Sequence, residues 1–255
     1  DSASARVAVE LRDVWFRYER DGADVLRGTT LAVPEGSLFA VVGGNGTGKS
    51  TMLRAICGVA RPYRGKITVL GRRLKEWKKA ELFRGGVALL PQDPLNLMVK
   101  KTVRGDLEEM LDGRGLTAEQ RVAAVGEVAT LTDIAPLLDA HPFDLSGGEV
   151  QRAVLAKVLL CEPRLLLDEP TKGLDAFFKD KLARLLRSLT ARGTTVLMVS
   201  HDVEFCASYA DWCALFFDGN VVTTNPPRQF FASNSFYTTA ANRISRGFFE
   251  NVVTV

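Results

Sequence analysis

Apolar residues along the chain fall into short runs of strand length, separated by segments with helical spacing. Four such runs are residues 38–42, 87–90, 165–167 and 195–199. Runs that are short and apolar throughout are typical of strands buried on both faces of a parallel sheet. Because helical segments alternate with them, the sequence predicts an α/β fold built on a mainly parallel sheet.

Two parts of the chain depart from this alternation. Near the N-terminus, residues 7–18 and 29–33 look like short alternating strands around a turn at Asp21-Gly22, which predicts a small antiparallel β subdomain. Residues 102–160 contain no convincing strand and several apolar helical faces, which predicts an inserted α-helical subdomain. Asp218-Gly219 separates two further apolar runs, the pattern of a β-hairpin.

The 255 residues suit one large domain. We divide it into a core with its β subdomain (residues 1–92 and 161–225), a helical subdomain (93–160) and a tail (226–255). No apolar run approaches the ~20 residues that span a bilayer, and no signal segment is present. The first residue is Asp rather than Met, which suggests a fragment of a longer chain. The net charge of +3 is too small to indicate nucleic-acid binding.

A phosphate-binding motif follows the first apolar run. Residues 43–50 fit the pattern G-x-x-x-x-G-K-[ST] and precede a helical segment, the context that this motif requires. Glycines let backbone N–H groups face a phosphate, and the helix start adds partial positive charge. Lys49 would reach the β- and γ-phosphates, and the Ser50 hydroxyl would ligate Mg²⁺. The expected nucleotide contacts here are Gly43, Gly44, Asn45, Gly46, Thr47, Gly48, Lys49, Ser50 and Thr51.

Three later strands each end in polar residues, where ligands gather in open α/β sheets. Asp168 suits a place on Mg²⁺, and Glu169 suits the general base for an attacking water. Gln92 can contact Mg²⁺ or that water, and His201 can sense the γ-phosphate. Taken singly, the two acids could be an exposed pair and the histidine a structural one.

A second candidate anion site precedes the helical segment at residues 150–159. Ser146, Gly147 and Gly148 lie at its N-terminus, and helix starts of this kind bind anions. Two phosphate-binding helix starts in one chain suggest two half-sites completed by dimerisation. The alternative is that Ser146 is only a helix cap.

Together these motifs closely resemble the ATP-binding cassette (ABC) ATPases over nearly the whole chain. In that resemblance Tyr18 is the adenine platform, residues 43–51 are Walker A and Gln92 is the Q-loop. Residues 145–149 are the signature, Asp168-Glu169 is Walker B with the catalytic base, Asp175 is in the D-loop and His201 is the switch histidine. The resemblance implies a P-loop NTPase (RecA-like) core, ATP and Mg²⁺ as cofactors, and ATP hydrolysis. It also implies a head-to-tail dimer with a second cassette, with ATP between Walker A and the partner's signature.

Finer features resemble the energy-coupling factor (ECF) transporter ATPases, which serve uptake of vitamins and transition-metal ions. They are residues 91–103, residues 168–175 (DEPTKGLD) and the tail at 230–243, which is similar to the second half of tandem ECF ATPases. The resemblance implies integral membrane subunits as partners and a peripheral place on the cytoplasmic face of the membrane. The segment from Gln92 through Leu97 and Val103 would contact a membrane subunit.

One departure and several alternatives remain open. The family usually has four apolar residues before the Walker B Asp, and this chain has three, so a slip would turn side chains to the other face. That leaves a cassette with little turnover as an alternative. A second alternative is a soluble, non-transport ABC ATPase, although we expect no nucleic-acid partner. We interpret the basic run at residues 72–79 as a solvated face, and the tail aromatics around Phe230 as packing or a contact surface.

Overall fold

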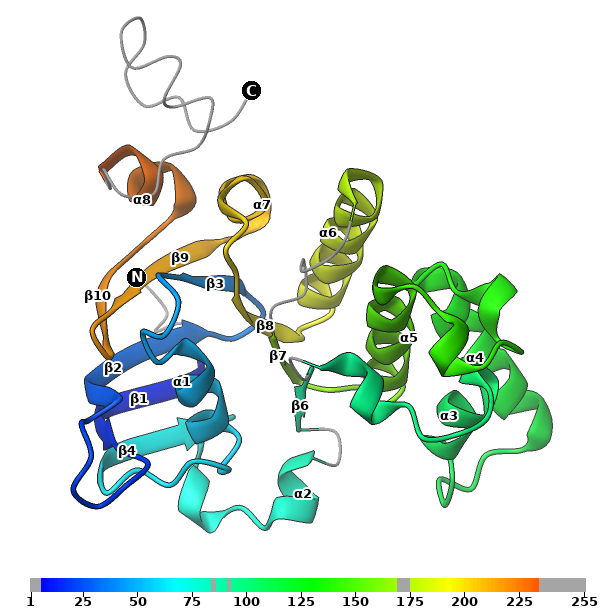
Figure 1. The fold of residues 1–255 in the computed structure, drawn as a ribbon, viewed down its shortest axis with the longest axis horizontal. Coiled ribbons are helices and arrows are strands. Elements are labelled where there is room, and N and C mark those ends of the chain that lie inside the picture. The colour runs from blue at the N-terminus through cyan, green and yellow to red at the C-terminus, as the bar shows by residue number, and fades with distance from the viewer. Residues whose placement is uncertain (1–5, 84–85, 91–92, 169–174, 234–255) are drawn as a thin grey trace, which may run out of the picture.

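The computed structural model describes residues 6–83, 86–90, 93–168 and 175–233, with the backbone alone for residues 165–168 and 233. It contains two sheets and a group of helices set to one side (Figure 1). The predicted antiparallel part, parallel core and helical insertion are all present. No helix in this described part combines the length and apolar character that crossing a bilayer requires.

The central sheet has six strands in the order β10-β9-β3-β8-β7-β6. Their bounds are β3 (Leu38–Val42), β6 (Val87–Leu89), β7 (Leu165–Asp168), β8 (Thr195–Val199), β9 (Trp212–Phe217) and β10 (Asn220–Asn225). All neighbouring pairs from β9 to β6 are parallel, as the apolar runs predict. The hairpin at Asp218-Gly219 is also confirmed, because β9 and β10 pair antiparallel and both turn residues have positive φ.

The second sheet is antiparallel, in the order β2-β1-β4-β5. Its strands are β1 (Val7–Phe16), β2 (Leu26–Pro34), β4 (Arg64–Val69) and β5 (Arg72–Arg73). The pairing of β1 with β2 confirms the predicted N-terminal hairpin. The sequence did not indicate β4 and β5, because the first half of β4 is Arg64-Gly65-Lys66 and β5 consists of two Arg residues.

Helices cover the sheets and form the separate group. Beside the sheets lie α1 (Lys49–Ile56), the 3₁₀ turn η1 (Leu74–Glu76), α2 (Lys79–Phe83), α6 (Ala176–Ala191), α7 (Val203–Tyr209) and α8 (Pro227–Ser233). The helical group contains η2 (Pro94–Leu97), α3 (Val103–Glu109), α4 (Ala118–Leu131), η3 (Ala135–Leu137), η4 (Pro142–Asp144) and α5 (Gly147–Leu159). Residues 102–160 therefore contain no strand, as expected.

The side-chain alternation of β3 divides the interior between two apolar clusters. Leu38, Ala40 and Val42 join the cluster that includes α5, α6 and the helical group. Phe39 and Val41 join the cluster beneath α1 and the antiparallel sheet. Because successive side chains of a strand point to opposite faces, one five-residue strand holds both halves of the core together.

The strand with too few apolar residues is nonetheless in regular register. Residues 165–168 of β7 pair with residues 195–198 of β8 without a shift. The ladder starts one residue earlier, since Arg164 N–H donates to Gly86 O (3.0 Å) and Arg164 O accepts from Thr195 N–H (2.8 Å). The backbone of Arg164 thus supplies the position that the apolar pattern lacks.

Phe230 and Phe231 of α8 are fully buried, whereas the remaining tail aromatics lie outside the described residues.

Candidate functional site

The loop between β3 and α1 depends on glycine for two distinct reasons. A Cβ on Gly43 would lie 2.3 Å from the carbonyl oxygen of Phe216, so only glycine lets the loop pack against β9. Gly48 has φ +105°, and a Cβ there would lie 2.8 Å from Val25 O. Residues other than glycine rarely adopt that backbone conformation. Glycine is therefore needed at both positions because the loop backbone passes close to Phe216 and Val25.

The helix that follows this loop begins without a side-chain cap. Gly48 precedes α1 and offers no capping oxygen, and the first turn of α1 carries no acid. By contrast, α3, α4, α5, α6 and α7 start with Thr102, Thr117, Ser146, Asp175 and Asp202 as caps. The first N–H groups and the positive end of the dipole of α1 are therefore suited to an external anion.

Lys49 is held inside the loop by backbone carbonyls. Its side chain is buried, and Nζ donates to Gly43 O (2.9 Å) and Gly44 O (2.5 Å). The Thr47 hydroxyl also donates to Gly44 O (3.0 Å) and closes the loop on itself. These contacts hold the ammonium group of Lys49 within the loop. A cation beside backbone N–H groups is an arrangement that suits a bound phosphate.

A cavity of ≈ 670 Å³ opens over this loop, within the size range of small-molecule sites. Its lining joins the loop to residues distant in sequence: Tyr18, Val25, Asn45, Gly46, Thr47, Gly48, Lys49, Ser50, Thr51, Val199 and His201. Tyr18 is 60% exposed, and its hydroxyl lies 2.9 Å from the Thr51 hydroxyl. Its ring meets Phe16 edge-on at 4.9 Å between centroids. One face of an aromatic ring is therefore available beside the phosphate loop.

His201 reaches the same cavity from the end of β8. Ser200 is fully buried and its N–H donates to Val41 O (3.1 Å), so the backbone is fixed just before the histidine. Just after it, Asp202 caps α7 through Phe205 N–H (3.0 Å) and pairs with Lys179 (2.5 Å). His201 is exposed between these two anchors, which places it as the sequence predicts.

Val25 lines the cavity although no sequence motif indicated it. It lies there because its N–H donates to Phe16 O (2.8 Å) in the β1–β2 pairing. Only the register of the two strands could reveal this, since an isolated valine carries no chemical signal. Gly43 and Gly44, which we also expected at the site, shape the loop beneath the cavity and do not line it.

The Ser146-Gly147-Gly148 turn is outside this cavity. Ser146 forms a capping box with Glu149, in which the serine N–H and hydroxyl both donate to Glu149 Oε2 (2.7 Å each). These hydrogen bonds lower the pKa of Glu149. The helix-cap reading is therefore correct within one chain. Ser146 and Gly147 are exposed, so the turn remains open to another molecule.

The other predicted residues are Asp175, Gln92, Glu169 and Asp168. Asp175 is exposed, accepts a hydrogen bond from Phe178 N–H (2.8 Å) as the cap of α6, and is not among the residues that line the cavity. Gln92 and Glu169 lie outside the described residues. For Asp168 the backbone alone is described, and its partner in the ladder is Met198 of β8.

The segment after Gln92 is tied to the interior by a buried ion pair. Lys157 Nζ of α5 lies 2.7 Å from Asp106 Oδ1, and their side chains are 9% and 0% exposed. Asp106 also accepts from Val99 and Lys100 N–H (3.0 and 3.1 Å), and Lys157 donates to Leu97 O (2.7 Å). Val103 is fully buried, so its expected role as a direct partner contact is wrong. Val99, at 67% exposure, is available instead.

The sequence profile of the ABC transporter family matches residues 26–172, from β2 through the loop at 43–50 to the residues after β7. The chain belongs to the ABC transporter ATP-binding family. The curated relatives agree with this. A putative ABC transporter ATP-binding protein of Bacillus cereus is 37% identical over 94% of this chain and 43% of its own length. The energy-coupling factor transporter ATP-binding protein EcfA of Methanocaldococcus jannaschii is 33% identical over 88% of this chain and 81% of its own length.

Solved structures place this family member among ABC cassettes. CbiO1 from Clostridium perfringens, part of the ABC transporter complex CbiONQ, has a TM-score of 0.80 at 25% identity, over 95% of this chain and 96% of that one. A dimeric ATP-binding cassette in a post-hydrolysis state with ADP and Pi has a TM-score of 0.78 at 27% identity, over 86% and 99%. The chain spans less than half the length of several curated relatives that it matches, 43–44% for three from Bacillus species.

Proposed function

We propose that this ABC cassette binds and hydrolyses ATP to drive transport. The observation that carries the proposal is the cavity that joins Tyr18, the uncapped start of α1, Lys49 and His201. The Tyr18 ring would stack on adenine, and the loop N–H groups and Lys49 would hold the β- and γ-phosphates. His201 would contact the γ-phosphate, and Glu169 would accept a proton from the attacking water.

Mg²⁺ fits the same edge of the sheet. Ser50 lines the cavity, and Asp168 ends β7, two strands from β3. Hydroxyl, carboxylate and amide oxygens are the ligands that Mg²⁺ takes beside a nucleotide's phosphates, so we assign Ser50, Asp168 and Gln92 to it. Bound there, the ion would neutralise charge on the phosphates.

We further propose that each site is completed by a second cassette. Ser146 and Gly147 are exposed, Gly148 is half-buried, and all three are outside the nucleotide cavity of their own chain, which favours a role in a neighbouring molecule. The capping box permits this, because Glu149 still accepts from Ser146 N–H when the hydroxyl turns to a phosphate. Asp175 would act at the same interface. Homodimer and heterodimer both satisfy this arrangement.

We infer that the transport is ECF-type uptake, of a vitamin or a transition-metal ion. The similarity to EcfA and to CbiO1 supports this class. Integral membrane subunits would contact the exposed residues of the segment 93–101, and the cassette would lie peripherally at the cytoplasmic face. No nucleic-acid partner is proposed. The regular register of β7 argues against a cassette with little turnover.

Substitution of Lys49 tests nucleotide binding. Lys49→Ala removes the cation that the loop fixes, and we expect at least a tenfold loss of ATP affinity in equilibrium titration. Lys78→Ala is the matched control, because Lys78 is exposed and far from the loop in sequence; its affinity should stay at the parent value. Equal affinities for the two variants would reject the site.

Partner capture tests the transport role separately. The cassette, expressed with an affinity tag in its source organism and purified from detergent-solubilised membranes, should bring integral membrane proteins with it. Reversing the exposed loop charge with Lys100→Glu should reduce their recovery while ATP binding stays unchanged. Recovery of ribosomes or DNA in place of membrane proteins would favour the non-transport alternative.

A further inference from the structure

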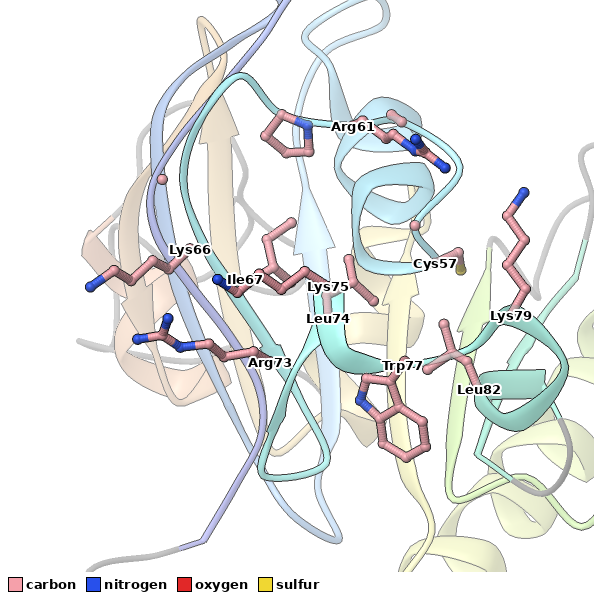
Figure 2. A pocket seen from close by; sticks show the side chains of 14 residues that line it. Cys57, Arg61, Lys66, Ile67, Arg73, Leu74, Lys75, Trp77, Lys79 and Leu82 are labelled. Carbon is pink, nitrogen blue, oxygen red and sulfur yellow. The ribbon is translucent and has the colours of Figure 1, made fainter.

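A second cavity, of ≈ 650 Å³, lies at the C-terminal end of α1, against β4, β5, η1 and α2 (Figure 2). It shares no lining residue with the nucleotide cavity. Its floor is apolar, formed by Cys57, Ile67, Leu74, Trp77 and Leu82. Burial raises the pKa of Cys57 to about 12, so the thiol adds no negative charge to the floor.

The margins of this cavity are cationic. Arg61, Lys66, Arg73, Lys75 and Lys79 line it, and among the residues that the structure describes no Asp or Glu does. In Figure 2 Lys66, Arg73 and Lys75 extend on one side of the cavity, and Arg61 and Lys79 on the other. A ligand in the cavity would therefore have positive charge on both flanks.

These five cations lack the acidic partners that neighbouring cations have. Arg64 pairs with Asp13 (2.8 Å) and Arg72 with Glu81 (2.6 Å), but within the described part of the chain none of the five is in an ion pair. The imbalance is local, since residues 54–79 contain nine Lys or Arg and one Glu while the whole chain has a net charge of +3. Like charges gathered without counterions repel one another, so an anion would stabilise this surface.

We propose that this cavity binds the headgroup of an anionic phospholipid at a membrane surface. Its phosphate would lie between the two rows of cations, with the adjoining glycerol and first methylenes on the apolar floor. Clusters of four to eight Lys or Arg are typical of sites for anionic lipids. Cytoplasmic loops of membrane proteins are themselves rich in Lys and Arg, so they match this charge poorly. Nucleic acid also matches poorly, because Trp77, the one aromatic side chain among the described residues that line the cavity, is covered by Arg72 at 4.9 Å.

The proposal is independent of ATP turnover and is tested without it. The chain is floated with vesicles of phosphatidylglycerol in phosphatidylcholine, and with phosphatidylcholine alone, at 0.1 M salt. We expect binding to the anionic vesicles only. Lys66→Gln/Arg73→Gln/Lys75→Gln should weaken it at least tenfold, since each cation near an anionic surface adds to the attraction. The matched control is Arg6→Gln/Arg192→Gln/Arg228→Gln, which removes the same charge from exposed positions elsewhere and should change binding less than twofold.

A fluorescence titration localises the contact. With Trp15→Phe and Trp212→Phe, Trp77 is the remaining tryptophan, and its emission should shift on addition of the anionic vesicles. Equal weakening in the two triple variants, or an unchanged Trp77 signal, would overturn the proposal in favour of general surface electrostatics. Absence of vesicle binding, or saturation of Trp77 by soluble glycerol 1-phosphate at concentrations where vesicles have no effect, would also overturn it.

Discussion

At the scale of single residues, two of the four glycines in the phosphate loop, Gly43 and Gly46, have different physical roles. Gly43→Ala would place Cβ 2.3 Å from Phe216 O, so β9 or the loop must move, whereas a Cβ on Gly46 meets nothing within 4 Å. We expect Gly43→Ala to lose nucleotide binding at least tenfold. Gly46→Ala, with φ +71°, should cost only about 1–2 kcal/mol of stability. Nucleotide titration and thermal unfolding of both variants check this, and equal affinities would contradict it.

The cysteines provide a second prediction at this scale. Burial raises the pKa of Cys57 and of Cys206 to about 12 and raises that of Cys213 further. Cys161 is only half-buried, and Arg114 and Lys157 partly oppose the upward shift of its pKa. Because the thiolate is the reactive form, iodoacetamide at pH 8 should label Cys161 first in the folded protein.

Mass spectrometry of the labelled chain reads this out. Cys161→Ser should leave the native protein nearly unlabelled, and 6 M guanidinium should expose the other three thiols. Raising the pH from 7 to 9 should increase labelling of Cys161, since more of it is then ionised. Rapid labelling of Cys206 at pH 8 would mean that the α7 region opens more readily than its burial implies.

The sequence predicted which residues line the nucleotide cavity when they belong to a motif. It did not predict those that reach the cavity through packing alone. Lys49, Tyr18 and His201 meet at one cavity, as their types and order suggest. Val25 joins them only through strand register. Asp175 and Ser146 cap helices. Ser and Asp are common both as helix caps and as ligand-binding residues, so the sequence alone could not decide between the two roles.

At the scale of elements, α3, α5 and the segment 93–101 are locked together by the Asp106–Lys157 pair. Lys157→Met would leave the fully buried Asp106 carboxylate without its counterion. Removing one partner of a buried pair costs about 3–5 kcal/mol, so we expect a loss of that order in chemical denaturation. Lys100→Met is the control, because the Lys100–Glu109 pair has side chains 46% and 37% exposed and should matter by less than about 1 kcal/mol.

A double variant separates charge from packing. Asp106→Leu with Lys157→Met removes both charges together, so it should be more stable than Lys157→Met alone, although Val99 and Lys100 N–H lose their acceptor. If Lys157→Met were no more destabilising than Lys100→Met, the pair would not be what holds this segment.

Elements were predictable from sequence when their periodicity was strong. β3 and β8 have the expected bounds, and the hairpin at Asp218-Gly219 forms because both turn residues accept positive φ. β7 begins its pairing at Arg164, which an apolar pattern cannot include. β4 and β5 were missed because their stability comes from pairing with β1 and with each other, a tertiary effect that overrides their charged composition.

At the scale of the whole molecule, the two helix starts that we propose as anion sites belong to different parts of the fold. α1 rises from the central sheet, and α5 belongs to the helical group on the other side (Figure 1). The nucleotide cavity includes the first and not the second. A site shared between two cassettes would therefore form only when two chains assemble. The sequence suggested such an assembly because one chain has two phosphate-binding motifs, but it did not show how far apart the two motifs lie.

Mixing two inactive variants distinguishes a shared site from a site within one chain. Lys49→Ala disables the phosphate loop. Gly147→Arg blocks the signature turn and leaves its own fold intact, because a Cβ there meets nothing within 4 Å. In a mixed head-to-tail dimer, one site combines the intact loop of one chain with the intact signature of the other. With random pairing, half of the dimers carry one such site, so ATPase activity should recover to about a quarter of the parent value.

The control mixture pairs Lys49→Ala with the double variant Lys49→Ala/Gly147→Arg, which offers no complete site in any combination and should stay inactive. Thermal unfolding of each variant alone establishes that all are folded before mixing. Adding Glu169→Gln to both members of the first mixture should trap an ATP-bound dimer on gel filtration, because hydrolysis can no longer reopen it. Activity in the mixture no greater than in the separate variants, with all chains folded, would place the whole site within one cassette.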